Sequence, residues 1–509
     1  MPRPDRVRAW LCAMSAAMTM ALNGYDSSTF NSVQGYKTFV NHFKAHPEDT
    51  IIEPNMLGAV GTAYTVGGIV SGMLITPTLS KKFGRKICMQ LGCAIVIAFT
   101  FLQVFAPNMP SFIAGRLIMG IGQGLALPNG PTYIAEIAPA AIRGMILSFW
   151  QVWYTIGAFI VYWVAYGCAK VPSLGLWQFR IPIILQILLP GAVIVSLFFC
   201  PESPRWLVEQ DRIEDARKSL AYVRREDEVE PELDSIVAAV YYEKTTIDLN
   251  QSWYAPYITL FKDPSLRHRM FVALFINCGQ QLTGNTTLAS YSTLIYQKVF
   301  NDPDTSFLIN SINASFAILF TLNCTWLIDR IGRKKILLWG GVGQAIALLL
   351  VAIVGLTTPV LDAEGHRPYS VGVGIAALMF VFILFYKPSW GATVWVYTSD
   401  IFSTNVRTHA IGIASQSQNV IATILNQFFP IFLAKCGFYT FLFFFGMNAV
   451  LALGVIWLLP ETKGVALEDM DELFGGVSHR AGGEAMGAVE EKLGKESEHI
   501  ESPPTVSKV

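Results

Sequence analysis

Long apolar runs separated by short polar clusters form the main pattern of this chain. Each run is about twenty residues long, the length of α-helix that crosses the hydrocarbon core of a lipid bilayer. Twelve such runs can be recognised, six on each side of a polar central segment. The predicted spans are 9–30, 55–79, 87–106, 111–131, 145–168 and 181–200, then 268–298, 305–328, 335–357, 371–398, 409–434 and 437–459. The pattern therefore predicts an all-α membrane protein in which twelve transmembrane helices form two six-helix bundles.

Short motifs recur in the same order in the two halves of the chain, about half its length apart. The repeated pairs are 79–86 with 327–334, 133–143 with 397–407, and 201–204 with 460–463. In an apolar chain, a duplication of this period is typical of transporters built from two membrane bundles. The chain therefore consists of two related halves, each ending in a charged Pro-Glu motif.

These patterns divide the chain into four segments. Residues 1–200 are predicted to form the N-terminal bundle and residues 267–460 the C-terminal bundle. Between them, residues 201–266 are polar and amphipathic, which predicts short helices in a cytoplasmic linker. Residues 461–509 form a cytoplasmic tail that is rich in Gly, Glu, Lys and Ser beyond Gly475. That composition predicts disorder over most of the tail.

The distribution of charge is more informative than its total. The 37 basic and 37 acidic residues cancel, and charged residues make up 15% of the chain, so the total charge does not predict binding to nucleic acid. Locally, basic residues cluster at 3–8, 81–86 and 330–335, in alternate loops. The positive-inside rule makes the side that carries these loops cytoplasmic. Both termini are then predicted to be cytoplasmic, in a multi-pass protein of the plasma membrane.

The sequence patterns predict no metal and no cofactor. The eight cysteines contain no CxxC pair, so neither a zinc site nor a disulfide framework is favoured. The sequence contains no GxxxxGKS or GxxxxGKT phosphate loop, which argues against a pump driven by ATP. Because no pattern of catalytic residues is present either, the chain is predicted not to be an enzyme.

Several motifs acquire meaning when they are read together. They are 23–26 in the first span, 115–116 in the fourth, and 131–144, 201–205, 329–333 and 460–464 at span ends. In their order and spacing these motifs resemble the sugar porter family of the major facilitator superfamily. Gly284 and Asn285 are similar to fungal members, which include sugar and lactose permeases. The resemblance implies the major facilitator fold and the transport of sugars by alternating access.

Three positions depart from the pattern of that family. Lys81 stands where the family usually has Asp, Asp400 replaces a Glu, and Ser403 replaces a Pro. The loop latch of the first half is therefore expected to be weaker than that of the second half.

Polar residues inside the apolar spans are the candidates for binding a substrate. Buried amides are costly in hydrocarbon, so they usually face a cavity or a partner helix. Amides donate and accept hydrogen bonds, as sugar hydroxyls do, and an indole can stack on a pyranose. The predicted substrate-binding residues are Gln151, Gln280, Gln281, Asn285, Thr286, Trp395, Gln418 and Asn419. The resemblance implies Gln151, Gln280, Gln281, Trp395 and Gln418, and hydrogen bonds between helices are the alternative for each residue.

Three positions predict an unusual pocket. Asn419 stands where the family often has Trp, and Ser290 stands where it often has Tyr, so aromatic bulk is missing at both. Lys387 lies inside the tenth span, where a cation is costly unless it pairs, snorkels or meets an anionic ligand. Its role is open between a structural pair or water-lined position and contact with a substrate such as a sugar acid.

Asp26 and Arg116 are isolated charges inside the first and fourth spans. Either would be costly without a partner, so we expect the two to pair. The resemblance implies that Asp at the first-helix position accompanies proton coupling, whereas facilitative members often have Asn. A titrating carboxylate beside an arginine would form a proton switch, and a static ion pair is the alternative.

A third group of charges is predicted to lie at the cytoplasmic ends of the helices. Its members are Arg85, Glu136, Arg143, Glu202, Asp329, Arg333, Asp400 and Arg407. Opposite charges there could tie the two bundles together in one conformation and release them in another. Partly exposed ion pairs of about 0–1 kcal/mol each are weak enough to break in such a cycle. The alternative is a solvated rim that only sets the topology.

The leading hypothesis from the sequence is a membrane transporter that takes up a sugar by proton symport, with membrane lipid around it. One alternative is a sugar sensor that does not transport, although such proteins usually carry a long signalling tail. Another is a transporter or exporter of a sugar acid or a natural product. The sequence does not identify the sugar or the oligomeric state.

Overall fold

The computed structural model describes most of the chain, and every regular element in the described residues is a helix. These residues are 4–44, 52–139, 146, 149–247, 260–300, 303–322, 330–358, 368–402, 404–463 and 474. Within them, nine helices are long and apolar enough to cross a membrane, judged by length and composition. The all-α prediction is confirmed, whereas the predicted disorder of the tail concerns residues outside the described ranges.

The first half of the chain folds into a bundle around the long helix α1 (Pro4–Val33), which packs against α9 (Trp150–Ala169) and α11 (Leu188–Phe198). On the other side of this bundle, α6 (Met109–Ala126) packs against both α3 (Pro54–Val70) and α5 (Arg85–Val104). The remaining elements of this half are α2 (Lys37–Phe43), η1 (Ser71–Ile75), α4 (Thr76–Phe83), α7 (Asn129–Ile137), η2 (Pro172–Leu174), α10 (Trp177–Ile184) and η3 (Leu185–Ile187).

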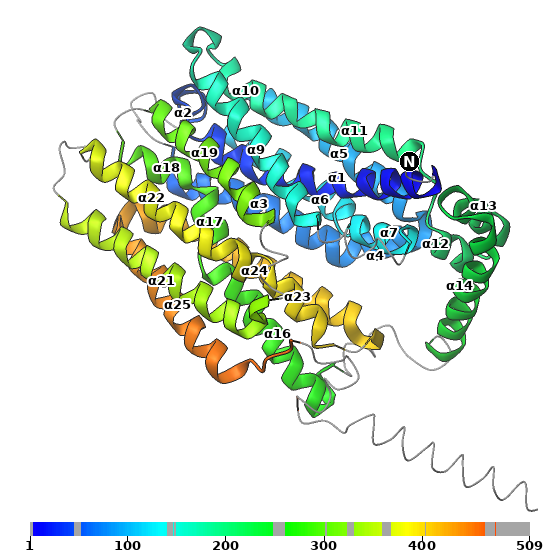
Figure 1. Ribbon diagram of the computed structural model, residues 1–509. Helices are drawn as coiled ribbons and strands as arrows, with labels where there is room; N and C mark the ends of the chain where they lie inside the picture. Colours follow the sequence, from blue (N-terminus) through cyan, green and yellow to red (C-terminus); the bar gives the residue numbers. More distant parts are fainter. Residues whose placement is uncertain are drawn as a thin grey trace, which may run out of the picture.

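The second half forms a second bundle beside the first (Figure 1). In it, α21 (Arg333–Thr357) packs against α22 (Tyr369–Tyr386) and α25 (Tyr439–Leu458), and α16 (Pro264–Leu282) packs against α24 (Thr404–Cys436). The remaining elements are α17 (Asn285–Ser290), α18 (Ser292–Gln297), α19 (Pro303–Leu322), η4 (Lys387–Gly391) and α23 (Thr393–Asp400). The order of these helices follows the order of the predicted spans.

Three of the expected spans are not among the nine apolar helices, and they carry much of the candidate chemistry. The first, α1, contains Asp26 among many Ser, Thr and Asn residues. The fourth is divided between α6 and α7 and contains Arg116, and the seventh is divided into α16, α17 and α18 and contains Gln280. The mean hydropathy of these three spans is therefore lower because they carry polar side chains inside the bundles.

Two helices of the second bundle are interrupted next to candidate residues. Gly284, between α16 and α17, has a φ of 90°, a left-handed conformation that favours glycine. A side chain there would come within 2.6 Å of the Phe444 ring. At the second interruption, α22 is followed by the π-helix η4, which contains Pro388; proline has no N–H to continue the helical hydrogen bonds. These breaks place Asn285 and Lys387 at the ends of helical segments.

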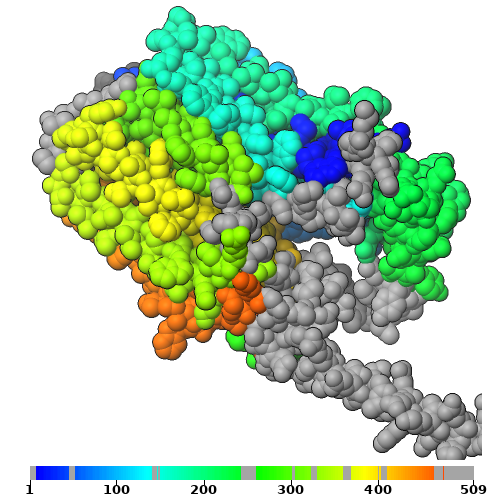
Figure 2. Space-filling model, in the orientation of Figure 1, coloured from blue at the N-terminus to red at the C-terminus, as the bar shows by residue number. Residues whose placement is uncertain are grey.

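The polar segment between the bundles forms the predicted short helices. They are α12 (Pro204–Glu209), α13 (Ile213–Val223) and α14 (Glu226–Ile247), and they share a small apolar core that includes Trp206 and Leu220. Arg224 fastens this linker to the first bundle, because its Nη1 donates to the backbone oxygen of Ile137 at 2.9 Å. The linker helices, in green, project from one end of the molecule (Figure 2).

The two ends of the molecule differ in charge and in contacts. We call the end that carries Lys81, Lys82, Arg85, Lys86, Arg333 and Lys334 the basic face; α4, α7 and the linker lie there, and α2 and α18 lie at the opposite face (Figure 1). Toward the opposite face, α3 packs against α24 and α9 packs against α19. Hydrogen bonds join the bundles there, from Thr423 Oγ1 to Thr65 Oγ1 at 2.9 Å and from Gln297 Nε2 to the backbone oxygen of Gly35 at 2.7 Å.

Candidate functional site

A glutamate caps a helix on the basic face of the first bundle. Both carboxylate oxygens of Glu202 accept the backbone N–H of Lys86 in the first turn of α5, at 3.2 Å. Gly84 precedes this helix with a φ of 92°, and a side chain there would come within 2.4 Å of Glu202 Oε2. Burial raises the pKa of Glu202, while hydrogen bonds from the N–H groups of Ser203 and Lys86 oppose the rise. The carboxylate thus lies where the start of a helix favours negative charge.

The second bundle repeats this arrangement. Glu461 Oε1 accepts the backbone N–H of Arg333 at 2.9 Å, and Oε2 accepts that of Lys334 at 3.1 Å. Gly332 precedes α21 with a φ of 95°. We call Glu202 and Glu461, each with its glycine and helix end, the two carboxylate caps.

Further contacts around the two caps are duplicated as well. A tyrosine hydroxyl donates to the backbone oxygen of the proline before each glutamate, and a lysine ammonium donates to a backbone oxygen near the end of the preceding helix. The pairs are Tyr133 to Pro201 at 2.6 Å with Tyr397 to Pro460 at 3.0 Å, and Lys86 to Cys200 at 2.7 Å with Lys334 to Ile456 at 3.0 Å. The tyrosine contacts are therefore the same in both halves, whereas the lysine contacts are similar but differ in position: Cys200 directly precedes Pro201, and Ile456 lies four residues before Pro460.

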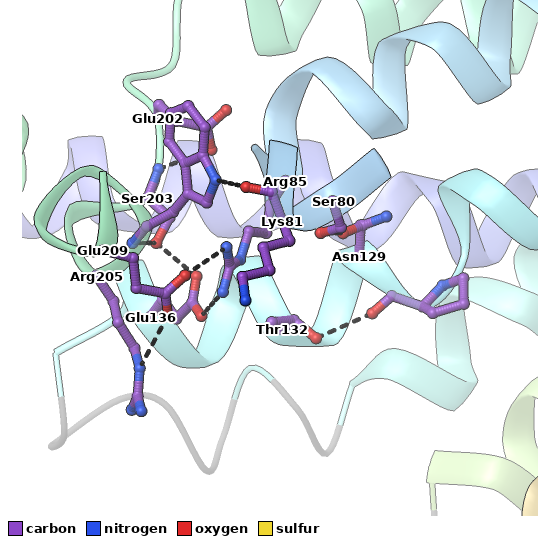
Figure 3. Close-up of polar contacts among 12 residues, drawn as sticks. Ser80, Lys81, Arg85, Asn129, Thr132, Glu136, Glu202, Ser203, Arg205 and Glu209 are labelled. Atoms are coloured by element: carbon purple, nitrogen blue, oxygen red, sulfur yellow. Dashed lines mark hydrogen bonds and ion pairs between the residues drawn. The ribbon is translucent and has the colours of Figure 1, made fainter. Parts of the chain in front are cut away.

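The first bundle also has an ion-pair network beside its cap. Arg85 Nη2 lies 3.0 Å from Glu136 Oε1, and its Nη1 lies 3.4 Å from Glu209 Oε2 (Figure 3). Ser203 donates its hydroxyl to the other oxygen of Glu136. The network therefore connects α5, α7 and the linker helix α12. Its ion pairs lie within one half of the chain.

The charged helix ends were predicted to tie the two bundles together in one conformation and to release them in another, and this stays a prediction. In the present conformation the hydrogen bonds and ion pairs described above for Arg85, Glu136 and Glu202 lie within the first bundle and its linker, and the N–H of Arg333 binds Glu461 of its own bundle. Arg143, Asp329 and the side chains of Asp400 and Arg407 lie outside the described part of the structure.

Asp26 and Arg116 are neighbours in the interior of the first bundle, but their side chains do not form the expected ion pair. Asp26 is 0% exposed and Arg116 is 2% exposed. Arg116 Nη1 donates to the backbone oxygen of Asp26 at 3.1 Å, and its guanidinium lies 4.8 Å from the centre of the Tyr64 ring. Both carboxylate oxygens of Asp26 are buried and accept no hydrogen bond from the described residues. Instead of an ion pair, the structure therefore has a buried carboxyl group next to a guanidinium. The guanidinium binds a backbone oxygen and lies near an aromatic ring.

A cavity of about 130 Å³ lies between the two bundles. α1 and α9 line it from the first half, and α17, α18, α19, α22 and η4 line it from the second half. Most of its polar groups are hydroxyls and amides, and the lining residues are Ser27, Ser28, Tyr154, Thr155, Ala158, Tyr162, Asn285, Thr286, Ala289, Ser290, Ser292, Asn310, Asn313, Ala314, Ala317, Ile383 and Lys387. We call this space the interbundle cavity. Its chemistry suits a small solute with several hydroxyl groups.

Of the predicted substrate-binding residues, Asn285 and Thr286 line the interbundle cavity. Gln280 is buried one turn earlier on α16, where its Nε2 donates to the backbone oxygens of Trp390 and Gly391 at 2.7 and 3.2 Å. In this conformation Gln280 therefore joins two helices, which was the alternative for this residue. Gln281 is also buried, and its Oε1 accepts no hydrogen bond from the described residues.

The other four predicted residues lie away from the lining of this cavity. Gln151 is in the first turn of α9, and Gln418 and Asn419 are on α24, where Asn419 Nδ2 donates to Gln416 Oε1 at 3.3 Å. Trp395 is 41% exposed, whereas Trp390, one turn earlier, is fully buried. The structure thus brings Asn285, Thr286, Ser290 and Lys387 together and leaves Gln151, Trp395, Gln418 and Asn419 apart from them.

Several lining residues were not predicted from the sequence. The two tyrosines Tyr154 and Tyr162 project from α9, and Asn310 and Asn313 project from α19. Tyr154 and Tyr162 are two helical turns apart, and the two asparagines are about one turn apart inside an apolar span. That spacing on one helix face was a usable signal.

A family model described as "Sugar (and other) transporter" matches residues 12–474 of the chain. Among similar curated proteins is one of Aspergillus flavus that bears the name "Probable quinate permease"; it is 28% identical over 488 residues, 93% of this chain and 90% of that protein. Another is the "High-affinity glucose transporter" of Kluyveromyces lactis, which is 28% identical over 486 residues, 92% of this chain and 86% of that protein.

Solved structures of the same fold include the xylose transporter XylE of E. coli. Its inward-open structure is 22% identical in sequence and superposes with a TM-score of 0.73 over 91% of this chain and 99% of that chain. Its partially occluded inward-open structure gives a TM-score of 0.74 over 90% of this chain and 100% of that chain. This likeness concerns the fold.

Proposed function

The chain belongs to the sugar transporter family and has the major facilitator fold, and we propose that it carries a sugar across the membrane together with a proton. The observation that supports this proposal most directly is the interbundle cavity, which receives hydroxyl and amide groups from both halves of the chain. A solute held between two bundles can be exposed to one side or the other when the bundles rock. Such a site is what alternating access requires.

The contacts between the bundles support a direction for the opening. The bundles touch toward the opposite face, where Asn31 Nδ2 donates to Ser292 Oγ at 2.8 Å and Lys170 Nζ lies 2.9 Å from Asp304 Oδ2. We infer that this conformation is closed at the opposite face and opens toward the basic face. With the basic face in the cytoplasm, as the positive-inside rule indicates, this would be the inward-facing state.

Asp26 is the proposed proton site. A buried carboxyl group without a hydrogen-bond partner is far more stable when it is neutral than when it is charged. Movement of α1 or α6 that turns Arg116 from the backbone oxygen toward the carboxylate would favour the charged form and release the proton. The position of the Arg116 guanidinium would thus couple proton loading to the arrangement of the helices.

The two carboxylate caps have a proposed role in moving each bundle as a unit. Each cap joins the start of one helix to the end of another within the same half, so it resists bending at the basic face. The network of Arg85, Glu136 and Glu209 adds the linker to the first bundle. The charged residues at the helix ends would then keep each bundle rigid while contacts between the bundles break at one face and form at the other.

The test is uptake of radiolabelled solutes by cells that lack their own sugar transporters. We expect the full chain to support saturable uptake of at least one member of a panel of hexoses, pentoses, disaccharides and sugar acids. Binding without uptake would instead favour the sugar sensor, and efflux without uptake would favour the exporter. Epitope tags at both ends, detected before and after permeabilisation, test the proposed plasma-membrane location with cytoplasmic termini.

A further inference from the structure

We infer that closure of the opposite face competes with binding of the solute, and that Asn31 on α1 is the positioning residue that links the two events. As that face closes, Asn31 and its partners use hydrogen-bonding positions that solute hydroxyls would otherwise fill. This inference rests on the proposed function, because it concerns the solute that the interbundle cavity carries. The observation behind it is that Asn31 binds Tyr162 and Ser292, which line this cavity from different halves of the chain.

Asn31 is 1% exposed, and its amide group is fully used in this conformation. Its Nδ2 donates to the Tyr162 hydroxyl at 2.9 Å and to Ser292 Oγ at 2.8 Å. Its Oδ1 accepts the backbone N–H of Thr293 at 3.1 Å and Gln34 Nε2 at 3.2 Å. Because a backbone N–H can only donate, the contact with Thr293 fixes which end of the amide is the oxygen. Asn31 therefore joins α1 to α18 with both ends of its side chain.

The second bundle continues these contacts through Asn310 on α19. Ser292 Oγ donates to Asn310 Oδ1 at 2.7 Å, and Asn310 Nδ2 donates to Thr293 Oγ1 at 2.9 Å. We call Asn31, Tyr162, Ser292, Thr293 and Asn310 the outer network. Three of its members, Tyr162, Ser292 and Asn310, line the interbundle cavity. The network thus closes the opposite face with groups that the cavity also presents to a solute.

The same hydrogen-bonding positions cannot serve both purposes. In the closed conformation the Ser292 hydroxyl accepts from Asn31 and donates to Asn310, so a solute hydroxyl must displace one of these bonds. Such an exchange gains little free energy, because one hydrogen bond replaces another. Separation of α1 from α18 leaves Asn31 and Ser292 each with a free position that a solute hydroxyl can fill. The solute therefore binds more tightly when the opposite face is open.

This competition works in both directions. If closure of the opposite face weakens binding of the solute by some factor, the solute favours opening of that face by the same factor. A solute would then bind tightly from the opposite face and leave more easily toward the basic face once the outer network has formed. The coupling factor can be measured as the change that a saturating solute causes in the ratio of open to closed protein.

The experiment uses the purified full chain in liposomes, with spin labels at Lys37 of α2 and Lys435 near the end of α24, both of which are exposed. The labels are attached through a ketone-bearing amino acid, so the native cysteines stay unchanged. Distances between the labels give the ratio of protein open to protein closed at the opposite face. The probes are D-glucose, D-xylose, lactose and D-gluconate, and the one that wild-type protein transports fastest is used. At saturation it should raise the open-to-closed ratio of the wild type by about tenfold.

Two variants separate this role from a merely structural one. Asn31→Ala should raise the open-to-closed ratio without solute and reduce the effect of the solute to less than about threefold. The matched control is Thr423→Val, which removes the bond at 2.9 Å between Thr423 and Thr65. That bond also joins the bundles toward the opposite face, but its two residues do not line the interbundle cavity. Thr423→Val should therefore raise the ratio without solute and keep the full effect of the solute.

The wild-type measurement alone keeps the inference testable if Asn31→Ala fails to fold. A transported probe that leaves the open-to-closed ratio unchanged, or lowers it, would overturn the inference and leave the proposed function standing. An effect of the probe in Asn31→Ala as large as in Thr423→Val would assign Asn31 a structural role and overturn the inference as well. Failure to transport any of the four probes would count against the proposed function, and the inference would fall with it.

Discussion

The two bundles share their caps and differ in their interiors. Glu202 caps the start of α5 through the N–H of Lys86, and Glu461 caps the start of α21 through the N–H groups of Arg333 and Lys334. Each capped helix follows a glycine with positive φ. The interior of the first bundle holds Asp26 beside Arg116, whereas the second contributes broken helices whose ends carry Asn285 and Lys387 to the cavity.

This comparison indicates that the two halves have kept similar capping contacts at their helix ends, whereas the residues inside the two bundles have diverged. The caps satisfy backbone N–H groups at helix ends, a requirement that both halves face equally. The proposed proton site and the proposed solute site have different requirements: the first needs a buried carboxyl group, and the second needs helix breaks that expose polar groups. We therefore expect substitutions in the caps to have matching effects in the two halves and substitutions in the interiors to have different ones.

The largest effect is expected from Asp26→Asn, which fixes this position in a neutral form. Because the residue could no longer exchange a proton, accumulation against a gradient should be abolished, while exchange of solute down its gradient should remain. Asp215→Asn is the matched control, since Asp215 lies in the linker in an ion pair with Arg212 at 2.7 Å. The check is uphill uptake together with exchange in the same liposomes; a variant that still concentrates solute would make Asp26 a structural residue.

The next effect separates the two adjacent glutamines of α16. Gln281→Ala should raise the apparent constant for the solute by about 5- to 150-fold, the consequence of losing about 1–3 kcal/mol of hydrogen bonding to a desolvated hydroxyl. Gln280→Ala should in addition lower the melting temperature, because Gln280 joins α16 to η4 through the backbone oxygens of Trp390 and Gly391. Kinetics and thermal unfolding of both purified variants make this comparison. Wild-type kinetics in Gln281→Ala would remove that residue from the site.

Substitution of the two cap glutamates compares how much each cap stabilises its half of the chain. Glu202→Ala and Glu461→Ala should each cost about 1–2 kcal/mol of stability, since each leaves helix N–H groups without their acceptor. The melting temperatures of the two variants should fall by similar amounts. A large difference between the two decreases in melting temperature would show that the similar geometry of the caps does not give similar stabilisation.

The cap of the first half also predicts a dependence on pH. Burial raises the pKa of Glu202 above its ordinary value of 4.5, so the folded protein keeps a proton that the unfolded chain loses. Stability from this group is then fully present below the unfolded pKa and is lost as pH rises through the folded pKa. Glu202→Gln should reduce the decrease in melting temperature between the unfolded and the folded pKa of Glu202. An unchanged dependence of melting temperature on pH would contradict the raised pKa of this group.

The smallest effect is expected from Asn419→Trp on α24. Restoring the missing aromatic group should narrow the path to the site and reduce uptake of disaccharides relative to hexoses by a factor of about five. Asn419 lies one turn before Thr423, which bonds Thr65 of the other bundle at 2.9 Å, so the bulk would lie near the interface. An unchanged ratio would show that this side chain does not face the path.

Much of the fold was predictable from hydropathy and repetition. The helices follow the order of the predicted spans, and the linker helices α12–α14 appear where amphipathic sequence indicated them. The contacts of the interior were harder to predict, because a contact depends on how helices rotate against each other. The sequence predicted an ion pair for Asp26 and Arg116, but the guanidinium binds the backbone oxygen of Asp26.

The candidate site was predicted in part for a similar reason. Asn285, Thr286 and Lys387 stood out as polar groups in apolar spans, and all three line the cavity. Ser27 lines it as well, but a single serine in a membrane helix gives no distinct signal, whereas the spacing of Tyr154 and Tyr162 on one helix face did give one. The sequence did not predict that Trp390 is buried and Trp395 is exposed, because the helix break at η4 decides which of the two tryptophans faces the interior.

The most direct test of the central claim is uphill uptake of the solute by wild-type protein in liposomes with an imposed proton gradient. The account predicts accumulation above the equilibrium ratio that collapses when a protonophore is added. Accumulation that ignores the protonophore, or uptake that stops at equal concentrations with the gradient intact, would contradict proton coupling and leave a transporter driven by another ion or by the solute gradient alone.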